Sequence, residues 1–227
     1  MKVERESCIG CGACVPYCTM GAISLLDNVV VIDQNECVDC GVCLRSRVCP
    51  VDALVYEPAS WPRSLRAIFS DPRTLSKETN IPGRGTEEMK TNEVTGTFKR
   101  GWIGIGLEIG RPGIGTRFRD VDKIAQAMAK EGAQFRLENP VTFLMEDVST
   151  GKIKKEVLDE KVMSAIIECL FPIEKMKDVL IALKEVSKEV DTVFSVECIS
   201  RVEPDDSLPV EKILSDLGVH YYINGKT

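Results

Sequence analysis

The chain has 227 residues, of which 44% are hydrophobic and 28% charged, and its formal net charge is −6. These proportions are ordinary for a globular protein of one to three domains, and no apolar run is long enough to cross a bilayer. Residues 1–60 carry four basic and eight acidic side chains, whereas residues 61–119 carry eleven basic and six acidic ones. Scattered basic residues beside acidic domains argue against nucleic acid as a partner.

Eight of the ten cysteines lie in two similar runs near the start of the chain. In each run three cysteines are separated by two residues, and a fourth follows: Cys8, Cys11, Cys14 and Cys18, then Cys37, Cys40, Cys43 and Cys49. The two runs form an internal repeat. Three thiolates at this spacing close around one face of a four-iron cluster, and the fourth is too far along the chain to reach the same face.

The repeat resembles the bacterial-type ferredoxin domain that carries two [4Fe-4S] clusters. The resemblance covers about residues 1–57 and implies two clusters as cofactors. Two departures from the family pattern are Thr19, where proline is usual, and five residues instead of three between Cys43 and Cys49, which bring Arg45 and Arg47 near a cluster. The resemblance implies that the first cluster is held by Cys8, Cys11, Cys14 and Cys49, and the second by Cys37, Cys40, Cys43 and Cys18.

Two other uses of these cysteines compete with this interpretation. Paired C-x2-C motifs also bind zinc, but the third cysteine of each run would then have no role. A disulfide framework needs an oxidising compartment, and residues 1–4 lead into the motif without a signal peptide. We therefore expect iron–sulfur clusters in a reducing cytoplasm, and their sensitivity to oxygen favours an anaerobic source.

The stretches between and after the cysteines predict a hairpin and an extended arm. Residues 22–32 alternate around Asp27-Asn28, a turn pair that predicts strands over 22–26 and 29–32. Residues 58–100 contain several prolines and little periodicity, apart from a possible short helix over 64–69. We interpret this stretch as an ordered connecting arm that lies on the protein's own domains or on a partner. Apolar residues set among the ligands are expected to shield the clusters from water, Ile9, Ile23, Val38 and Leu54 among them.

Six glycines mark residues 101–115. A strand is predicted over 102–109, with glycines on one face that would let another backbone or a ligand approach closely. The spacing of Gly104, Gly106 and Gly110 differs by one residue from the dinucleotide-binding fingerprint. We therefore favour a structural strand and turn over a nucleotide site.

The remaining pattern predicts an α/β sandwich over residues 101–227. Helices are expected over 120–132, 172–190 and 209–217, and strands over 141–148, 152–157, 162–171, 192–202 and 219–223. The main order, strand-helix-strand-strand-helix-strand, is typical of the split βαβ sandwich. The fold class is therefore α+β. The order also resembles ACT-like ligand-sensing or dimerising modules, and this resemblance makes a homo-oligomer through the sheet a candidate assembly.

The other candidate residues have ordinary structural explanations. Cys169 and Cys198 are expected to pack in the sandwich rather than bind metal. His220 is the only histidine, and no motif gives it a catalytic partner. The acidic pairs Glu87-Glu88 and Asp205-Asp206 are expected to be solvated loop residues.

The functional prediction is an electron-transfer protein or subunit that relays electrons, one at a time, to or from a catalytic partner. No catalytic constellation stands elsewhere in the sequence, so whether the chain is itself an enzyme stays open. One alternative is a self-contained oxidoreductase with a substrate site in residues 83–119 and the C-terminal domain. Another is a redox or metabolite sensor. In the enzyme alternative a carboxylate or phosphate would be bound by Arg84, Arg100, Arg111, Arg117 and Arg119.

Overall fold

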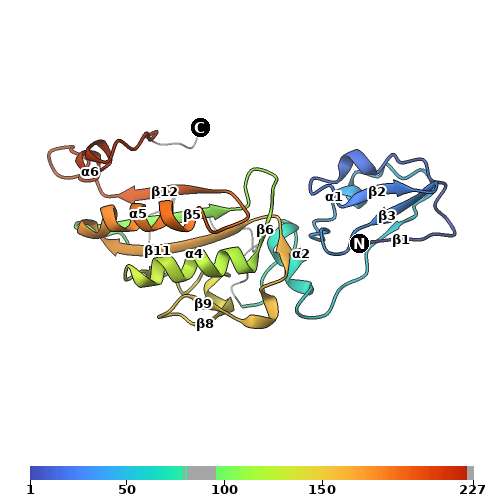
Figure 1. Cartoon of the computed structure of the whole chain (residues 1–227), viewed down its shortest axis with the longest axis horizontal. Coiled ribbons are helices and arrows are strands. Elements are labelled where there is room, and N and C mark those ends of the chain that lie inside the picture. The colour runs from blue at the N-terminus through green and yellow to red at the C-terminus, as the bar shows by residue number, and fades with distance from the viewer. Residues whose placement is uncertain (79, 81–95, 224–227) are drawn as a thin grey trace.

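The structure of the protein is a computed structural model, which describes residues 1–78, 80 and 96–223. The chain forms a small N-terminal unit (residues 1–57) and a larger C-terminal unit (residues 96–223), with helix α2 (Ser64–Ser70) between them (Figure 1). The sheet and helices of the larger unit confirm the α+β class.

Two short antiparallel strand pairs frame the N-terminal unit. Strand β2 (Ile23–Leu26) pairs with β3 (Val29–Ile32), and β1 (Lys2–Val3) pairs with β4 (Leu54–Val55). The turn between β2 and β3 holds Asp27 and Asn28 with φ of 47° and 60°, the left-handed conformation that a two-residue hairpin requires. The predicted hairpin is therefore confirmed.

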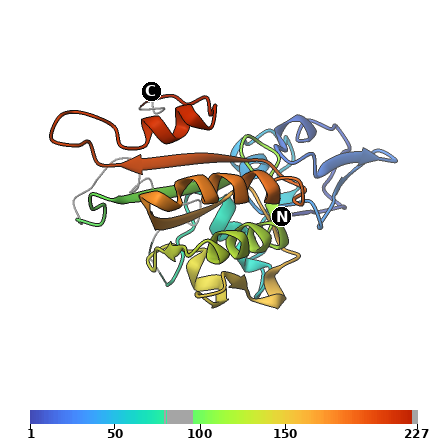
Figure 2. The same cartoon turned by 60° about the vertical axis from the view of Figure 1, so that its left-hand side comes forward.

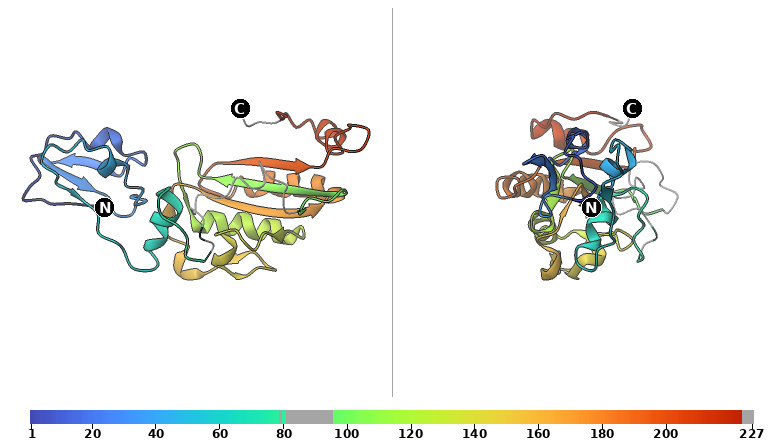
Figure 3. Two further views of the ribbon diagram at one scale, coloured as in Figure 1. Left: turned by 180° about the vertical axis from the view of Figure 1, so that it is seen from behind. Right: turned by 90° about the vertical axis from the view of Figure 1, so that its right-hand side faces the viewer.

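A four-stranded antiparallel sheet forms the C-terminal unit. Its order is β12 (Phe194–Ser200), β5 (Trp102–Ile109), β11 (Ala165–Pro172) and β7 (Gln134–Phe135). Helices α4 (Phe118–Lys130) and α5 (Met176–Val186) lie side by side on one face (Figures 1 and 2), and from behind the strands lie in front of them (Figure 3). Alternate residues of β5 join these helices in one buried core: Ile103, Ile105, Leu107 and Ile109.

In chain order, the second strand of this sheet is β7, which lies outside every strand that the sequence pattern predicted. The strand predicted over 141–148 is confirmed only in its second half: a 3-10 turn, η2 (Thr142–Leu144), is followed by β8 (Met145–Asp147). Strand β8 pairs with β9 (Lys152–Ile153), within the partner strand predicted over 152–157, but this pair lies outside the main sheet. Val141, Leu144 and Met145 are nevertheless buried. Apolar side chains can therefore enter the core from a turn as well as from a strand. The edge of the main sheet is formed instead by the two-residue strand β7.

The end of the chain also differs from expectation. Residues 219–223 contain no strand, and Tyr222 and Ile223 are 80% and 63% exposed. The helix predicted from residue 172 begins later, because Pro172 ends β11 and a 3-10 turn, η4 (Ile173–Lys175), precedes α5. Smaller elements complete the unit: β6 (Thr116–Arg117) paired with β10 (Lys161–Val162), η3 (Lys155–Val157) and α6 (Glu211–Asp216).

Helix α2 belongs by packing to the C-terminal unit. Its Leu65 and Phe69 are buried in the same core as β5 and α4. The ring of Phe69 meets Phe118 edge to face at 5.1 Å, and Ser70 Oγ accepts a hydrogen bond of 2.9 Å from the Met163 amide. The short helix predicted near this position is confirmed. Within the described ranges, none of these helices is long and apolar enough to cross a membrane.

The glycine-rich stretch forms a closed turn after β5. The Gly115 amide donates to the Gly110 carbonyl at 2.9 Å, and the Gly110 amide donates to the Val193 carbonyl at 2.7 Å. Gly110 has a φ of 90°, and a Cβ there would lie 2.9 Å from both the Gly115 carbonyl carbon and the Met163 carbonyl oxygen. These glycines therefore allow a tight backbone turn, as we expected when we favoured a strand and turn over a nucleotide site.

Two alanine substitutions separate backbone conformation from crowding in this turn. Gly113 is also left-handed, with φ of 67°, but its Cβ would meet nothing within 4 Å. We expect Gly113→Ala to lower the free energy of unfolding by about 1–2 kcal/mol, and Gly110→Ala by roughly 1–3 kcal/mol more because of overpacking. Denaturant unfolding followed by circular dichroism measures both. Equal effects would contradict the crowding seen at Gly110.

Candidate iron–sulfur centre

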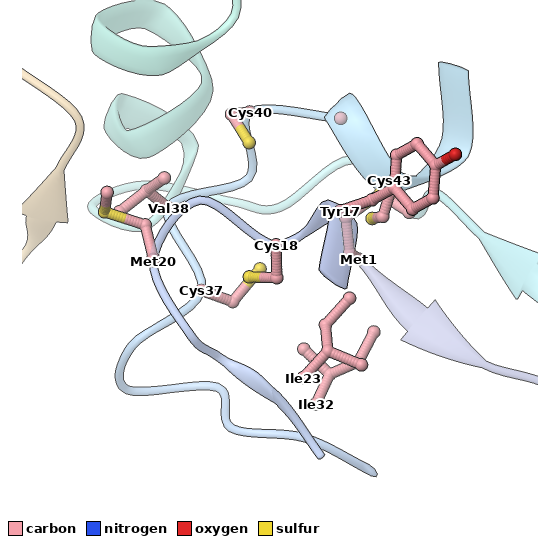
Figure 4. A pocket seen from close by; sticks show the side chains of 11 residues that line it. Met1, Tyr17, Cys18, Met20, Ile23, Ile32, Cys37, Val38, Cys40 and Cys43 are labelled. Atoms are coloured by element: carbon pink, nitrogen blue, oxygen red, sulfur yellow. The ribbon is translucent and has the colours of Figure 1, made fainter. Parts of the chain in front are cut away.

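The eight cysteines of the repeat gather into two groups of four around two cavities. We call the first the junction cavity, because it faces the C-terminal unit, and the second the outer cavity. Figure 4 shows the junction cavity, where cysteines from two separate stretches of chain surround one space with Met20 and Val38 beside them. The junction cavity is lined by Cys18, Cys37, Cys40 and Cys43, and the outer cavity by Cys8, Cys11, Cys14 and Cys49.

The fourth cysteine of each run therefore lies with the three cysteines of the other run. A 3-10 turn, η1 (Val15–Tyr17), follows Cys14 and carries the chain to Cys18. In the second half, α1 (Val42–Arg45) and the turn after it carry the chain to Cys49. The two additional residues before Cys49 are taken up in this turn, where Arg47 has a φ of 51°.

Both crossing cysteines receive the same backbone hydrogen bond. The amide of Ala22 donates to Cys18 Sγ at 3.2 Å, and the amide of Ala53 donates to Cys49 Sγ at 3.2 Å. A donor aimed at sulfur stabilises negative charge there, which is one way a protein adjusts a cluster. The two halves of the repeat thus present their crossing thiols in equivalent environments.

The two cavities differ in exposure. Two cysteines of the junction cavity, Cys37 and Cys43, are buried. In the outer cavity only Cys14 is buried, whereas Cys11 is exposed and the neighbouring Ile9 is 62% exposed. Apolar side chains line both spaces, as the sequence predicted for Ile9, Ile23, Val38 and Leu54. Water therefore reaches the outer cavity more readily, although both are largely apolar.

Burial disfavours bare thiolates in these cavities. Desolvation raises the pKa of Cys14, Cys37 and Cys40 above the ordinary thiol value, and raises that of Cys43 to about 11. A metal-ligating cysteine must be deprotonated. Without a metal these four thiols therefore stay protonated near neutral pH, so any metal bound here must displace their protons.

The donor sets fit iron–sulfur clusters better than the other uses of cysteine. Zinc would need four ligands within about 2.3 Å of one ion, and in the described ranges no group of three or more His, Cys, Asp or Glu is placed to hold a single metal ion. Four thiols set around a wider space match a four-iron cluster. All ten cysteines are free, so they form no disulfide framework.

The arginines proposed as an anion site do not converge. Each described member contacts a carboxylate instead: Arg100 pairs with Glu203, Arg111 with Glu108, Arg117 with Glu36 and Arg119 with Asp159. Arg84 lies outside the described residues. Arg45, expected near a cluster, pairs with Asp71 at 3.0 Å. The basic stretch therefore serves mainly to join parts of the chain.

The remaining candidates lie away from the cavities. Cys169 is fully buried beside Ile105 in the sheet, as expected, and burial holds its pKa far above the ordinary value. Cys198 is exposed on the edge strand β12, so the expectation that it packs in the core is wrong. His220 is exposed and contacts only the ring of Tyr222 within the described part of the chain. Asp205 and Asp206 lie in an exposed loop, and Glu87 and Glu88 fall outside the described residues.

Comparisons with known proteins agree with the geometry of the two cavities. The profile of the "4Fe-4S dicluster domain" family matches residues 7–60. Ferredoxin-2 of Chlorobaculum tepidum is 43% identical over 56 residues, which are 22% of this chain and 87% of that protein. This chain belongs to the 4Fe-4S dicluster ferredoxin family. Membership covers its N-terminal quarter and brings two [4Fe-4S] clusters as cofactors.

Two further relatives align with the same quarter of the chain. A "ferredoxin-like protein in vnf region" of Azotobacter chroococcum is 42% identical over 55 residues, which are 23% of this chain and 85% of the relative. One component of an ion-translocating oxidoreductase complex of Methanosarcina acetivorans is 40% identical over 52 residues, 23% of this chain but only 19% of the relative. No solved structure matches the chain significantly.

The crossing of the fourth cysteines makes a testable prediction. Replacing Cys49 with alanine should damage the cluster of the outer cavity, because Cys49 Sγ lies with Cys8, Cys11 and Cys14. Iron analysis and paramagnetic resonance of anaerobically purified protein would detect loss or conversion of one cluster. The matched Cys18→Ala change should damage the other one. Damage by Cys49→Ala only to the cluster of Cys37, Cys40 and Cys43 would contradict the crossing.

The two remaining cysteines give a control on the ligand set. The double variant Cys169→Ala, Cys198→Ala should keep the full iron content, because both residues lie in the C-terminal sheet. Iron and sulfide analysis of the loaded protein measures this directly. Loss of a cluster in the double variant would mean that a ligand has been assigned to the wrong residue.

Proposed function

We propose that the protein is an electron-transfer subunit that relays electrons one at a time between a redox partner and a catalytic partner. The ferredoxin-type domain indicates electron transfer. The observation that supports the relay is the pair of four-cysteine cavities, one exposed at the free end and the other facing the C-terminal unit. The clusters, when bound, supply the one-electron chemistry.

The proposal assigns a ligand set to each cluster. Cys8, Cys11, Cys14 and Cys49 hold the outer cluster, and Cys37, Cys40, Cys43 and Cys18 hold the junction cluster. This assignment is supported by the grouping of the side chains and by the matching amide donors at Cys18 and Cys49. The polypeptide positions the thiols, excludes part of the water and orients two amides toward sulfur.

The proposal gives the C-terminal unit the task of attaching a partner. Residues 1–57 would carry the clusters, 58–100 would connect, and 101–227 would form a split βαβ module of the ACT-like kind. The sheet order β12-β5-β11-β7 with two helices on one face supports this. The described arginines of the basic stretch are already paired with carboxylates, which disfavours a substrate site there.

An anaerobic redox titration tests the function. The full chain should contain about eight iron and eight sulfide, and two clusters should each take up one electron in paramagnetic resonance. Co-purification from the native source should bring a catalytic subunit with it. A loaded protein that reduces or oxidises a substrate without a partner would instead support the self-contained enzyme, and about four iron per chain would contradict the relay.

A further inference from the structure

A nearly buried arginine joins the loop of the junction cavity to the C-terminal unit. Arg66 of α2 is 5% exposed. Its Nη1 donates to the carbonyl oxygens of Gln34 at 2.8 Å, Asn35 at 3.3 Å and Cys37 at 2.8 Å, and its Nε pairs with the carboxylate of Glu160. One side chain therefore contacts both the residue that begins the second cysteine run and the C-terminal unit.

The position of Arg66 is fixed from the C-terminal side. On the same helix, Leu65 and Phe69 are buried in the core of the C-terminal unit, and the hydroxyl of Ser70 accepts a hydrogen bond from the Met163 amide. The guanidinium group is thus held by a rigid helix rather than by a flexible arm. Its Nη1 donates to the carbonyl oxygens while its Nε pairs with Glu160, and a single ammonium nitrogen cannot reproduce these two separated donor positions.

A second, more exposed set of contacts surrounds this arginine. Arg117 donates to Glu36 at 2.8 Å and to the Asn35 carbonyl at 3.4 Å, and Lys161 pairs with Glu36 and holds the pKa of that carboxyl below its ordinary value. The Glu36 side chain is 36% exposed, whereas those of Arg66 and Glu160 are 7% and 13% exposed. Exposed ion pairs contribute little. Arg63 and Arg45 also cross between the units, but their side chains are 27% and 30% exposed, so Arg66 is the most buried basic side chain in the connection.

The connection reaches only one of the two cavities. Among the described residues, the hydrogen bonds and ion pairs that cross from the arm and the C-terminal unit end on residues 34–39 and on Arg45. None of them ends on Cys8, Cys11, Cys14 or Cys49, the cysteines of the outer cavity. The C-terminal unit can therefore act on the junction cavity without acting on the outer one.

We propose that Arg66 is a positioning residue through which the C-terminal unit stabilises the junction cluster. The proposal rests on the ligand assignment given above. Partners that orient a metal ligand change metal affinity by about 10–100-fold, and Arg66 orients the carbonyl of Cys37. Coupling between two sites is reciprocal, so the loaded junction cavity also stabilises the docking of the two units.

The first experiment measures how fast each cluster is lost to an iron chelator. The loaded full chain is compared in two backgrounds, Cys11→Ala, which leaves the junction cluster, and Cys40→Ala, which leaves the outer cluster. Arg66→Met should speed loss of the junction cluster by about tenfold or more and leave the outer cluster unchanged. Arg66→Lys should restore only part of the wild-type rate, because it keeps the charge without the planar donors.

Matched variants guard against a folding defect. Arg119→Met removes a nearby arginine that contacts only Asp159 in the described residues, and it should behave as wild type. If Arg66→Met does not fold, Glu160→Gln weakens the same connection from its other end and should speed loss of the junction cluster alone. Equal loss of both clusters, or no change in either, would overturn the proposal.

The reciprocal experiment reads the C-terminal unit instead of the iron. Hydrogen exchange of the full chain should become faster in α2, β6 and β10 when Cys40→Ala removes the junction cluster, and stay unchanged in Cys11→Ala. The same exchange in both variants would overturn the coupling. The iron content separates a failure of the ligand assignment from a failure of the role proposed for Arg66. If Cys40→Ala loses the outer cluster, the ligand assignment is wrong. If Cys40→Ala loses only the junction cluster and hydrogen exchange does not change, the assignment stands and only the role of Arg66 is rejected.

Discussion

The N-terminal unit depends on one constraint, that each set of four thiols draws on both halves of the repeat. Cys18 lies with the second run and Cys49 with the first. Neither half can close a complete set alone, so the fold needs the β1–β4 pairing that brings the ends of the unit together. Units this small bury too little apolar surface to be very stable, and their buried thiols resist ionisation. We therefore expect iron binding to stabilise the fold of this unit.

Cysteine spacing made the cluster region predictable, whereas the sandwich was predictable only in part. The hairpin at Asp27-Asn28 and the strands β5 and β11 followed from turn chemistry and from regular alternation. The run over 141–148 was also apolar, yet it begins as a turn and enters a strand only at Met145, in a pair outside the main sheet. Local apolarity reports burial, but it does not report which backbone conformation delivers it.

Charge was the least predictable property of this chain. Of the arginines that looked like an anion site, all four that the structure describes pair with a carboxylate, as Arg100 does with Glu203 far along the sequence. No motif marks Arg66, because its partners are backbone carbonyls and Glu160, which sequence spacing cannot bring together. The available signal was a charged residue within an apolar helix, between Leu65 and Phe69.

A repeated sequence tends to make two equivalent clusters, and the C-terminal unit removes that equivalence. The amide bonds to Cys18 and Cys49 are both 3.2 Å long, so hydrogen bonding to the crossing sulfurs does not distinguish the cavities. Burial and nearby charge do, because Arg63, Arg66 and Lys161 approach only the loop of residues 34–39. Both are properties by which a protein adjusts cluster potential. Part of the difference between the two cysteine cavities therefore originates outside the ferredoxin repeat.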